Sequence, residues 1–204
     1  MASTHARAPA FAAQVTLLAG ALLTGAAWAQ EIKVNVERRG ERIVVDLSGQ
    51  VAAPLPEAWA VLVDYEHMPA FITSLKTSAV LRRDGNQWEV SQSGETKFGM
   101  FKFAFASVRR VELVPQREVR SHLVSGDFSH YESTMRLGEE GGHTTLVYHG
   151  EYVPKSWIPP LVGPSMIAGE TKRHYTQLFA EILRRHVAAQ AGSAPPAPRA
   201  SAPM

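Results

Sequence analysis

The chain contains no cysteine, and this absence excludes several kinds of chemistry at once. Disulfide bonds, thiol catalysis and cysteine–zinc sites all need the sulfur that the sequence lacks. A strong charge of one sign is also missing, because 21 basic and 19 acidic residues are interspersed along the chain. We therefore expect no nucleic-acid partner, and we expect the fold to be stabilised by packing alone.

Common catalytic and cofactor signatures are absent as well. The sequence has no H-E-x-x-H zinc motif, no G-x-S-x-G nucleophile motif, no glycine-rich phosphate loop and no dinucleotide fingerprint. Histidines are numerous, but alternation places four of them on strand faces turned to solvent, and a zinc site needs ligands that converge on one point. These four are His122, His130, His143 and His149. We expect a solvated polar face there, no metal and no cofactor.

A single long apolar run, residues 15–29, stands near the N-terminus and ends in Ala27-Trp28-Ala29. The run is shorter than the roughly 20 residues of a membrane-spanning helix, and small residues occupy the two positions that a signal peptidase reads. We predict a signal peptide over 1–29, cleaved after Ala29, and export, to the periplasm in a Gram-negative source. An uncleaved membrane anchor is the alternative.

The opposite end, residues 188–204, is rich in alanine, proline and serine and has no periodic apolar pattern. This composition predicts a disordered tail, which leaves one domain over 30–187.

Within that domain, period-two alternation predicts strands over 31–37 and 41–51 and further strands from about residue 75 to Pro154. The turns between them are short, which favours antiparallel pairing. Two short helices are predicted after the first long strand, one ending near Tyr65–Glu66 and one running from Pro69 to about Ser74. A long helix with an apolar face is predicted from about Ser165 to Val187.

The stretch VDYEHMPAFI, residues 63–72, gathers an acid, a phenol and a histidine between the two short helices. Asp64 and His67 could share a metal ion, but no third ligand is evident. We interpret the stretch as the corner between the helices.

Three segments carry a resemblance to a known family: VAAPLPEAWAVLVDYEHMPAFI, GDFSHYESTMRL and IPPLVGPSMIAGETKRHYTQLFAEILRR. In the order and spacing of these segments, the chain resembles the START-like (SRPBCC) superfamily of polyketide cyclase/dehydrase and lipid-transport proteins. It looks most like the coenzyme Q-binding START branch of that superfamily. The resemblance implies an α+β helix-grip fold, in which a curved antiparallel sheet of about seven strands wraps around the C-terminal helix and leaves an apolar cavity. The resemblance does not predict which strand pairs with strand 31–37.

One position departs from that branch. A tryptophan that points into the cavity is usual there, and Met135 stands at the corresponding place in this chain. Methionine is smaller and more adaptable, so the resemblance alone does not carry a quinone ligand over.

Strand alternation predicts which side chains line the cavity. Phe128 falls with His130 on the outer face, because its neighbours in phase are hydrophilic. The predicted lining is Trp88, Val90, Gln92, Phe101, Phe103, Phe105, Ser121, Leu123, Tyr131, Ser133, Met135, Leu146 and Tyr148 from the sheet, with Ile167, Thr171 and His174 from the last helix. For each residue alone, ordinary core packing is the alternative.

The loop before the last helix carries Trp157, Ile158 and Leu161 between prolines. It is predicted to form an apolar lip at the cavity mouth, which either gates the cavity and touches a membrane transiently or folds back as a plug. His174 interrupts the apolar face of the last helix, with Glu170 one turn earlier. It is a weak catalytic candidate and equally a histidine at the edge of the core.

Two functions follow from these observations. The first is an exported binding or carrier protein for an apolar small molecule, such as a lipid, a quinone or a polyketide-like compound. The alternative is a cyclase/dehydratase-type enzyme that folds a reactive chain in the same cavity, with His174, Tyr131 and Tyr148 as acid–base candidates. The sequence does not predict the ligand or the oligomeric state.

Overall fold

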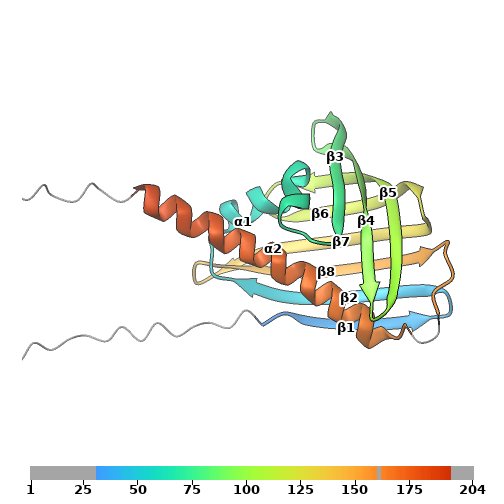
Figure 1. The fold of residues 1–204 in the computed structure, drawn as a ribbon. Coiled ribbons are helices and arrows are strands. Elements are labelled where there is room, and N and C mark those ends of the chain that lie inside the picture. Colours follow the sequence, from blue (N-terminus) through green and yellow to red (C-terminus); the bar gives the residue numbers. More distant parts are fainter. Residues whose placement is uncertain (1–30, 160–161, 194–204) are drawn as a thin grey trace, which may run out of the picture.

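A computed structural model describes residues 31–159 and 162–193 of the protein. Within these residues, two strands are followed by two short helices, six further strands and a long final helix (Figure 1). The elements are β1 (Lys33–Arg39), β2 (Arg42–Val51), α1 (Leu55–Leu62), η1 (Tyr65–Ala70), β3 (Leu75–Asp84), β4 (Gln87–Phe98), β5 (Phe101–Val114), β6 (Glu118–Gly126), β7 (Phe128–Glu140), β8 (His143–Pro154) and α2 (Pro164–Ser193).

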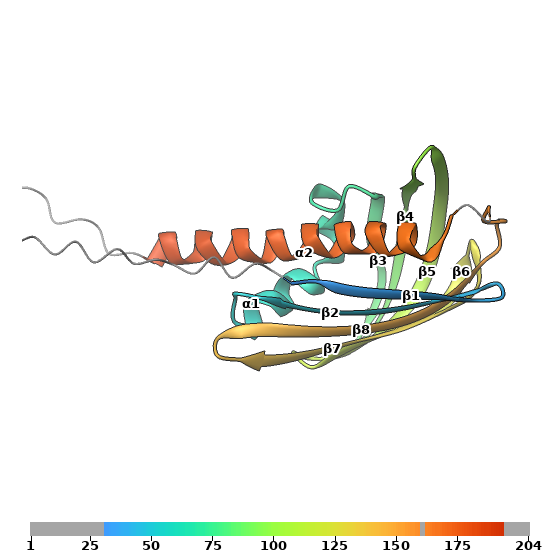
Figure 2. The same cartoon turned by 90° about the horizontal axis from the view of Figure 1, so that it is seen from below.

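The strands form one eight-stranded antiparallel sheet in the order β1-β2-β8-β7-β6-β5-β4-β3. The sheet curls, and α2 lies across its concave side (Figures 1 and 2). The predicted α+β helix-grip fold is therefore confirmed. The strand that sequence reasoning left unplaced is β1, which forms a hairpin with β2 from Lys33 opposite Ser48 to Arg39 opposite Arg42 and ends the sheet.

The entry into β3 passes so close to the sheet that only glycine fits on the neighbouring strand. A Cβ atom built on Gly94 of β4 would lie 2.0 Å from the backbone oxygen of Ser74. The same oxygen accepts a hydrogen bond from the Glu95 backbone N–H at 2.9 Å. This contact fixes the start of the edge strand β3 on β4, next to α1 and η1, which cover one end of the concave face (Figure 1).

The apolar core has two parts. The larger lies under α1, η1 and the middle of α2 and is centred on the fully buried Phe179, Ile182 and Ile72. The smaller lies under the first turns of α2, where Ile167 packs against Ile43 of β2. Apolar side chains at helical spacing thus attach α2 to the sheet at two places. The cavity described below is lined by residues from both parts of the core.

Three predicted helix boundaries are wrong. The first short helix was expected to end near Tyr65–Glu66, but α1 ends at Leu62. A helix from Pro69 to Ser74 was expected, but the second short helix is the 3-10 segment η1, with Pro69 inside it. Proline has no backbone N–H to donate. A short 3-10 segment makes few backbone hydrogen bonds, so it tolerates the absence of this donor. Helix α2 continues through Ser193, beyond the expected end at Val187, and its added residues include alanine and glutamine, which are good helix formers.

The predicted signal peptide, residues 1–29, lies outside the described residues. Of the predicted disordered tail, residues 188–204, the part up to Ser193 is helical and belongs to α2, and the rest lies outside the described residues. Among the described helices, none combines the length and the hydropathy that crossing a bilayer requires.

The VDYEHMPAFI stretch is a corner that is fastened to α2. Asp64 lies 2.6 Å from the Nδ1 atom of His67 and accepts a hydrogen bond from Arg185 of α2 at 2.8 Å. Arg185 also donates to Glu181 at 2.7 Å. Although burial acts in the opposite direction, the hydrogen bonds from His67 and Arg185 lower the pKa of Asp64. The polar side chains that resembled a metal site therefore take part in ion pairing.

Candidate ligand-binding cavity

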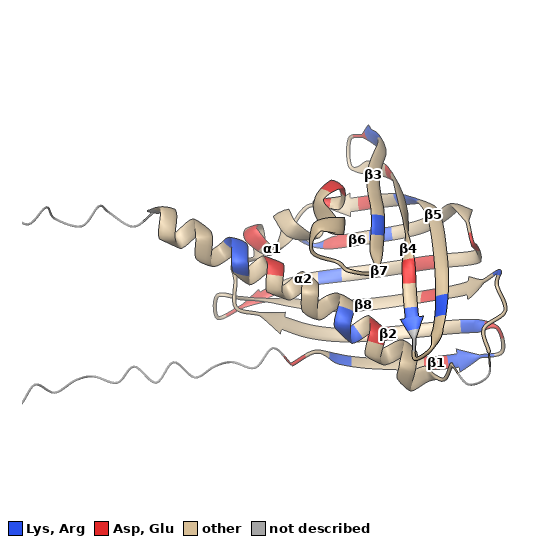
Figure 3. Ribbon diagram, in the orientation of Figure 1, with Lys and Arg blue, Asp and Glu red and all other residues tan. Residues whose placement is uncertain are grey.

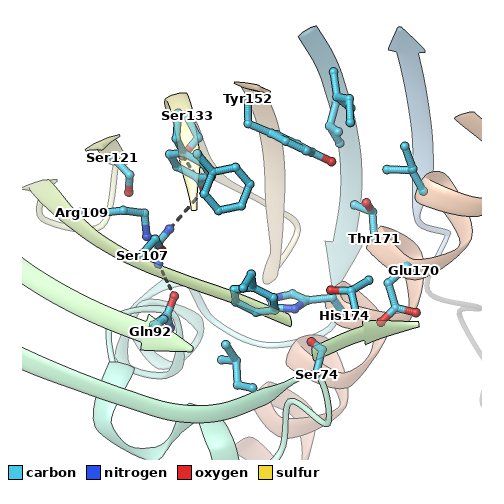
Figure 4. Close-up of a pocket in the computed structure, with 18 of the residues that line it drawn as sticks. Ser74, Gln92, Ser107, Arg109, Ser121, Ser133, Tyr152, Glu170, Thr171 and His174 are labelled. Atoms are coloured by element: carbon cyan, nitrogen blue, oxygen red, sulfur yellow. Dashed lines mark hydrogen bonds between the residues drawn. The ribbon is translucent and has the colours of Figure 1, made fainter. Parts of the chain in front are cut away.

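A cavity of about 360 Å³ lies between the concave face of the sheet and α2 (Figure 4). Ligand pockets in proteins commonly have volumes of about 300–1,000 Å³, so this cavity is large enough for a small molecule. Many of the predicted lining residues do line it. They are Gln92, Phe103, Phe105, Ser121, Tyr131, Ser133, Met135, Tyr148, Ile167, Thr171, His174 and, from the predicted lip, Ile158.

Other residues on the predicted face do not reach the cavity. Val90 and Leu146 are fully buried in the core. Trp88 packs edge-on against Tyr65, with the Arg83 guanidinium over its ring. Phe101, at the start of β5, packs on the smaller core. Alternation reports which face of a strand a side chain occupies, but the long strands extend past the cavity at both ends.

Leu123 is also absent from the lining. The pairing of β5 with β6 shifts register between Val108 and Arg109, so that Arg109 lies opposite Leu123 and Val108 opposite Ser125. Directly paired residues share a face, so Leu123 lies on the inner face with Arg109, but it stands at the bulged end of this pairing, is half-buried and does not reach the cavity. Of the predicted lip, Trp157 does not line the cavity and is 74% exposed, and Leu161 lies outside the described residues.

Phe128 was expected on the outer face, and this prediction is wrong. The pairing of β7 with β8 shifts register between Phe128 and His130, which moves the first residue of β7 to the inner side. Phe128 lines the cavity, and its ring lies 5.9 Å from the rings of both Tyr131 and Tyr152. A single bulge thus adds an aromatic side chain to the wall.

Arg109 is the functional candidate that sequence reasoning missed. It lies on β5 in phase with Phe103, Phe105 and Ser107, all of which line the cavity. Its Nη1 atom donates to the Tyr131 hydroxyl at 3.2 Å, and its Nη2 atom donates to Gln92. The signal was available, because the alternation of the phenylalanines continues through Arg109 and places a cation on an apolar face.

The guanidinium changes the acidity of the phenols around it. Burial is the largest influence on the pKa of Tyr131 and raises it, but the charge of Arg109, which lies 5.3 Å from the ring centre, together with hydrogen bonds to Ser133, Tyr148 and Arg109, lowers the pKa overall. Burial raises the pKa of Tyr148 and Tyr175 well above the ordinary value. Tyr131 is the only one of the five tyrosines whose pKa is lowered, and it therefore releases its proton most easily.

His174 faces the same cavity from α2 (Figure 4). Burial, with a smaller contribution from the charge of Arg109, lowers its pKa to about 4. The imidazole is therefore neutral at neutral pH and adds no charge to the cavity. Glu170, one turn earlier, pairs with Arg173 at 2.7 Å.

The outer face of the sheet carries the four strand histidines that were weighed as metal ligands. His122 and His149 are exposed, as predicted, and His149 lies 2.7 Å from a carboxylate oxygen of Asp46. Figure 3 shows charged residues of both signs along these strands. In residues 31–159 and 162–193, no cluster of three or more side chains suited to hold a metal ion occurs.

The family is decided by a match over residues 51–177 to the model of the polyketide cyclase/dehydrase and lipid transport family. The chain belongs to this family. The matched range includes most of the sheet wall of the cavity, apart from Ile43 and Val45 of β2, and most of the face of α2 that lines it. The finer likeness to the coenzyme Q-binding branch stays a prediction. A search of curated proteins finds no significant match.

Solved structures share the fold at low sequence identity. A STAR-related lipid transfer protein from Xanthomonas axonopodis is 12% identical, with a TM-score of 0.62, covering 76% of this chain and 98% of that one. A START superfamily protein from Mycobacterium smegmatis is 16% identical, with a TM-score of 0.60 and coverage of 70% and 98%. The Zhui aromatase/cyclase from a Streptomyces species is 16% identical, with a TM-score of 0.59 and coverage of 71% and 95%.

Proposed function

We propose that the protein binds or carries an apolar small molecule, such as a lipid, a quinone or a polyketide-like compound, in the cavity between the sheet and α2. The observation that carries this proposal is a cavity of about 360 Å³ with aromatic and aliphatic walls and a few polar groups, which come from both the sheet and α2. A family that includes lipid transport supports it. Apolar contact supplies affinity in such sites, and the polar groups fix the orientation of the ligand.

A matched pair of variants on β7 tests the proposal. Ser133 lines the cavity, and Glu132, its neighbour in the chain, is exposed on the other face. Ser133→Phe fills the cavity, so we expect it to weaken the binding of the neutral apolar dye Nile red at least about tenfold, and Glu132→Phe to leave binding unchanged. Equal dye binding by both variants and the unchanged protein would place the dye elsewhere and refute the proposal.

A second candidate function is cyclase/dehydratase-type catalysis, and one observation favours it. The phenol with the lowered pKa, Tyr131, contacts a cation that could stabilise developing negative charge on a carbonyl oxygen. The test is turnover of a poly-β-keto thioester analogue. An enzyme of this kind would lose about 100-fold or more of its rate on Tyr131→Phe while it still bound Nile red. Equal rates for the variant and the unchanged protein would exclude this role.

Export is a further part of the proposal. The predicted cleavage after Ala29 means that the mature protein recovered from its source cells begins at Gln30. N-terminal sequencing of the protein from the periplasmic and membrane fractions tests this. A soluble periplasmic chain that starts at Gln30 supports it, and a chain that retains residues 1–29 contradicts it.

Transient membrane contact is proposed for the end of the molecule where the β4–β5 turn and the β8–α2 connection lie (Figures 1 and 2). Met100 and Trp157, which these segments carry, are 88% and 74% exposed. Lys97 and Lys102 face each other across the base of the β4–β5 turn, and this charge suits an anionic bilayer. Co-sedimentation with phosphatidylglycerol vesicles should fall for the Met100→Ala, Trp157→Ala double variant. Unchanged co-sedimentation would refute the contact.

A further inference from the structure

Arg109 is a cation without an anion. Among the described residues it is the only lysine or arginine that lines the cavity, and no carboxylate lies within ion-pairing distance of it. The two carboxylates that do line the cavity have other partners. Asp127 accepts a hydrogen bond from the Ala106 backbone N–H at 2.7 Å, and Glu170 pairs with Arg173.

The hydrogen bonds of Arg109 are also incomplete. Its acceptors, Gln92 and the Tyr131 hydroxyl, are both neutral, and its buried Nε atom has no hydrogen-bond partner. A guanidinium carries five N–H donors, and a charge held away from water is costly unless an opposite charge compensates it. A cation held in this way, on the wall of a cavity, indicates that the missing charge belongs to the ligand.

The surroundings of Arg109 can complete a small anion site. The hydroxyls of Ser107 and Ser121 lie on the same wall in Figure 4, and the hydroxyl of Ser133 donates to Tyr131 at 3.4 Å. Toward the first turns of α2, Ile43, Val45 and Ile167 pack into one apolar cluster that lines the cavity, beside Glu170 and Thr171 of the helix. A ligand with one polar head and an apolar body matches this division, with the head on the sheet wall.

The charge of the head follows from the charge of the site. His174, the other basic side chain of the cavity, is neutral because burial lowers its pKa to about 4, which leaves a single positive charge. A phosphate monoester carries a charge of about −1.5 to −2 at neutral pH and would bring excess negative charge into the cavity. A carboxylate carries one charge and accepts two parallel hydrogen bonds from a guanidinium.

We propose that the ligand is an amphiphilic carboxylate, such as a free fatty acid, whose carboxylate pairs with Arg109 while its apolar body fills the space toward the start of α2. This inference rests on the proposed function and names the chemical class of the ligand for the same cavity.

The experiment compares ligands that share one chain and differ only in the head. Dodecanoate, dodecanol, methyl dodecanoate and dodecyl phosphate are titrated into the full chain, below their micelle-forming concentrations, by displacement of Nile red. We expect dodecanoate to bind about 10- to 100-fold more tightly than dodecanol and the methyl ester, because a charged pair replaces a neutral contact. Dodecyl phosphate is expected to bind less tightly than dodecanoate.

Variants on β5 assign the effect to one side chain. Arg109→Met should remove the preference for dodecanoate and leave dodecanol binding intact, and Arg109→Lys should keep part of the preference. Arg110 is the next residue on the same strand and is exposed, so Arg110→Met is the matched control and should behave as the unchanged protein.

The ligand series on the unchanged protein decides the matter even if a variant fails to fold. Equal affinity for dodecanoate and dodecanol would overturn the carboxylate inference while the proposed function stands. Tighter binding of dodecyl phosphate would overturn it in favour of a phosphate head. Failure of every ligand and of Nile red to bind would overturn the proposed function itself.

Discussion

Replacing Arg109 with methionine should make the ligand-free protein more stable, although it damages the site. Moving an ion into a protein interior costs several kcal/mol after relaxation, and no anion compensates Arg109. Its two hydrogen bonds to neutral partners stabilise the folded protein by about 1.5–3 kcal/mol each and so offset this cost. These terms nearly cancel, and methionine adds apolar contact of similar volume. We expect a net gain of about 1–2 kcal/mol in the free energy of unfolding.

The partners of Arg109 keep other hydrogen bonds after this change. Gln92 still donates from Nε2 to Ser78 at 3.0 Å, and the Tyr131 hydroxyl still accepts from Ser133 at 3.4 Å, whereas the neutral Oε1 atom of Gln92 loses the donor Arg109, which offsets part of the gain. For this reason the substitution differs from breaking a buried ion pair, which would strand a charge and cost about 3–5 kcal/mol.

The assay is urea unfolding of delipidated protein, with Arg110→Met as a control that should stay within about 0.5 kcal/mol of the unchanged protein. Dodecanoate should reverse the order of stability. At 100 times its dissociation constant it adds about 2.7 kcal/mol to the unchanged protein and little to Arg109→Met. A loss of stability of about 2 kcal/mol or more in delipidated Arg109→Met would refute the reasoning, because the guanidinium would then be well compensated without a ligand.

Three further predictions concern the scaffold that holds the cavity open. Phe179→Ala should lower the free energy of unfolding by about 3–5 kcal/mol in urea, because Phe179 is fully buried beneath α2; a loss below about 1 kcal/mol would contradict that packing. Gly94→Ala should lower the free energy of unfolding by at least about 3 kcal/mol, because the added Cβ would overlap a backbone oxygen. Gly169→Ala, in open space on α2, should raise it by about 0.5–1 kcal/mol. Similar effects at both positions would contradict the close approach at Gly94. Glu181 has its pKa lowered from 4.5 to about 2, by the hydrogen bond from Arg184 above all, so its stabilising contribution is present above pH 4.5 and is lost as the pH falls toward about 2. Glu181→Gln should therefore cost about 1–2 kcal/mol at neutral pH, after allowance for the exposure of Arg184, and almost nothing at pH values near 2; an equal cost at both would refute the linkage.

Alternation along the strands was sufficient to predict the sheet, its inner face and much of the lining of the cavity. It succeeds because side-chain direction in a regular strand has a period of two, so that Phe103 and Phe105, for example, must share a face. It fails at bulges. The register shift at the start of β7 moved Phe128 inward.

The alternation of residues along one strand predicts neither whether an inner side chain reaches the cavity nor which strands become neighbours. Val90 and Phe103 both occupy the inner face, yet Val90 is buried in the core and Phe103 lines the cavity, because the long strands reach past it. Arg109 was overlooked for a different reason. An arginine is ordinarily a surface residue, and its place beside Tyr131 depends on which strands become neighbours in the sheet.

The most direct test of the cavity as a binding site is mass spectrometry of what the protein carries. The full chain and its Ser133→Phe and Glu132→Phe variants are purified from the source cells without detergent and extracted with organic solvent. We expect an apolar small molecule in near-equal molar amount from the unchanged protein and from Glu132→Phe, and strongly reduced amounts from the cavity-filling Ser133→Phe. Equal recovery from all three proteins, or no bound molecule in any of them, would contradict the account.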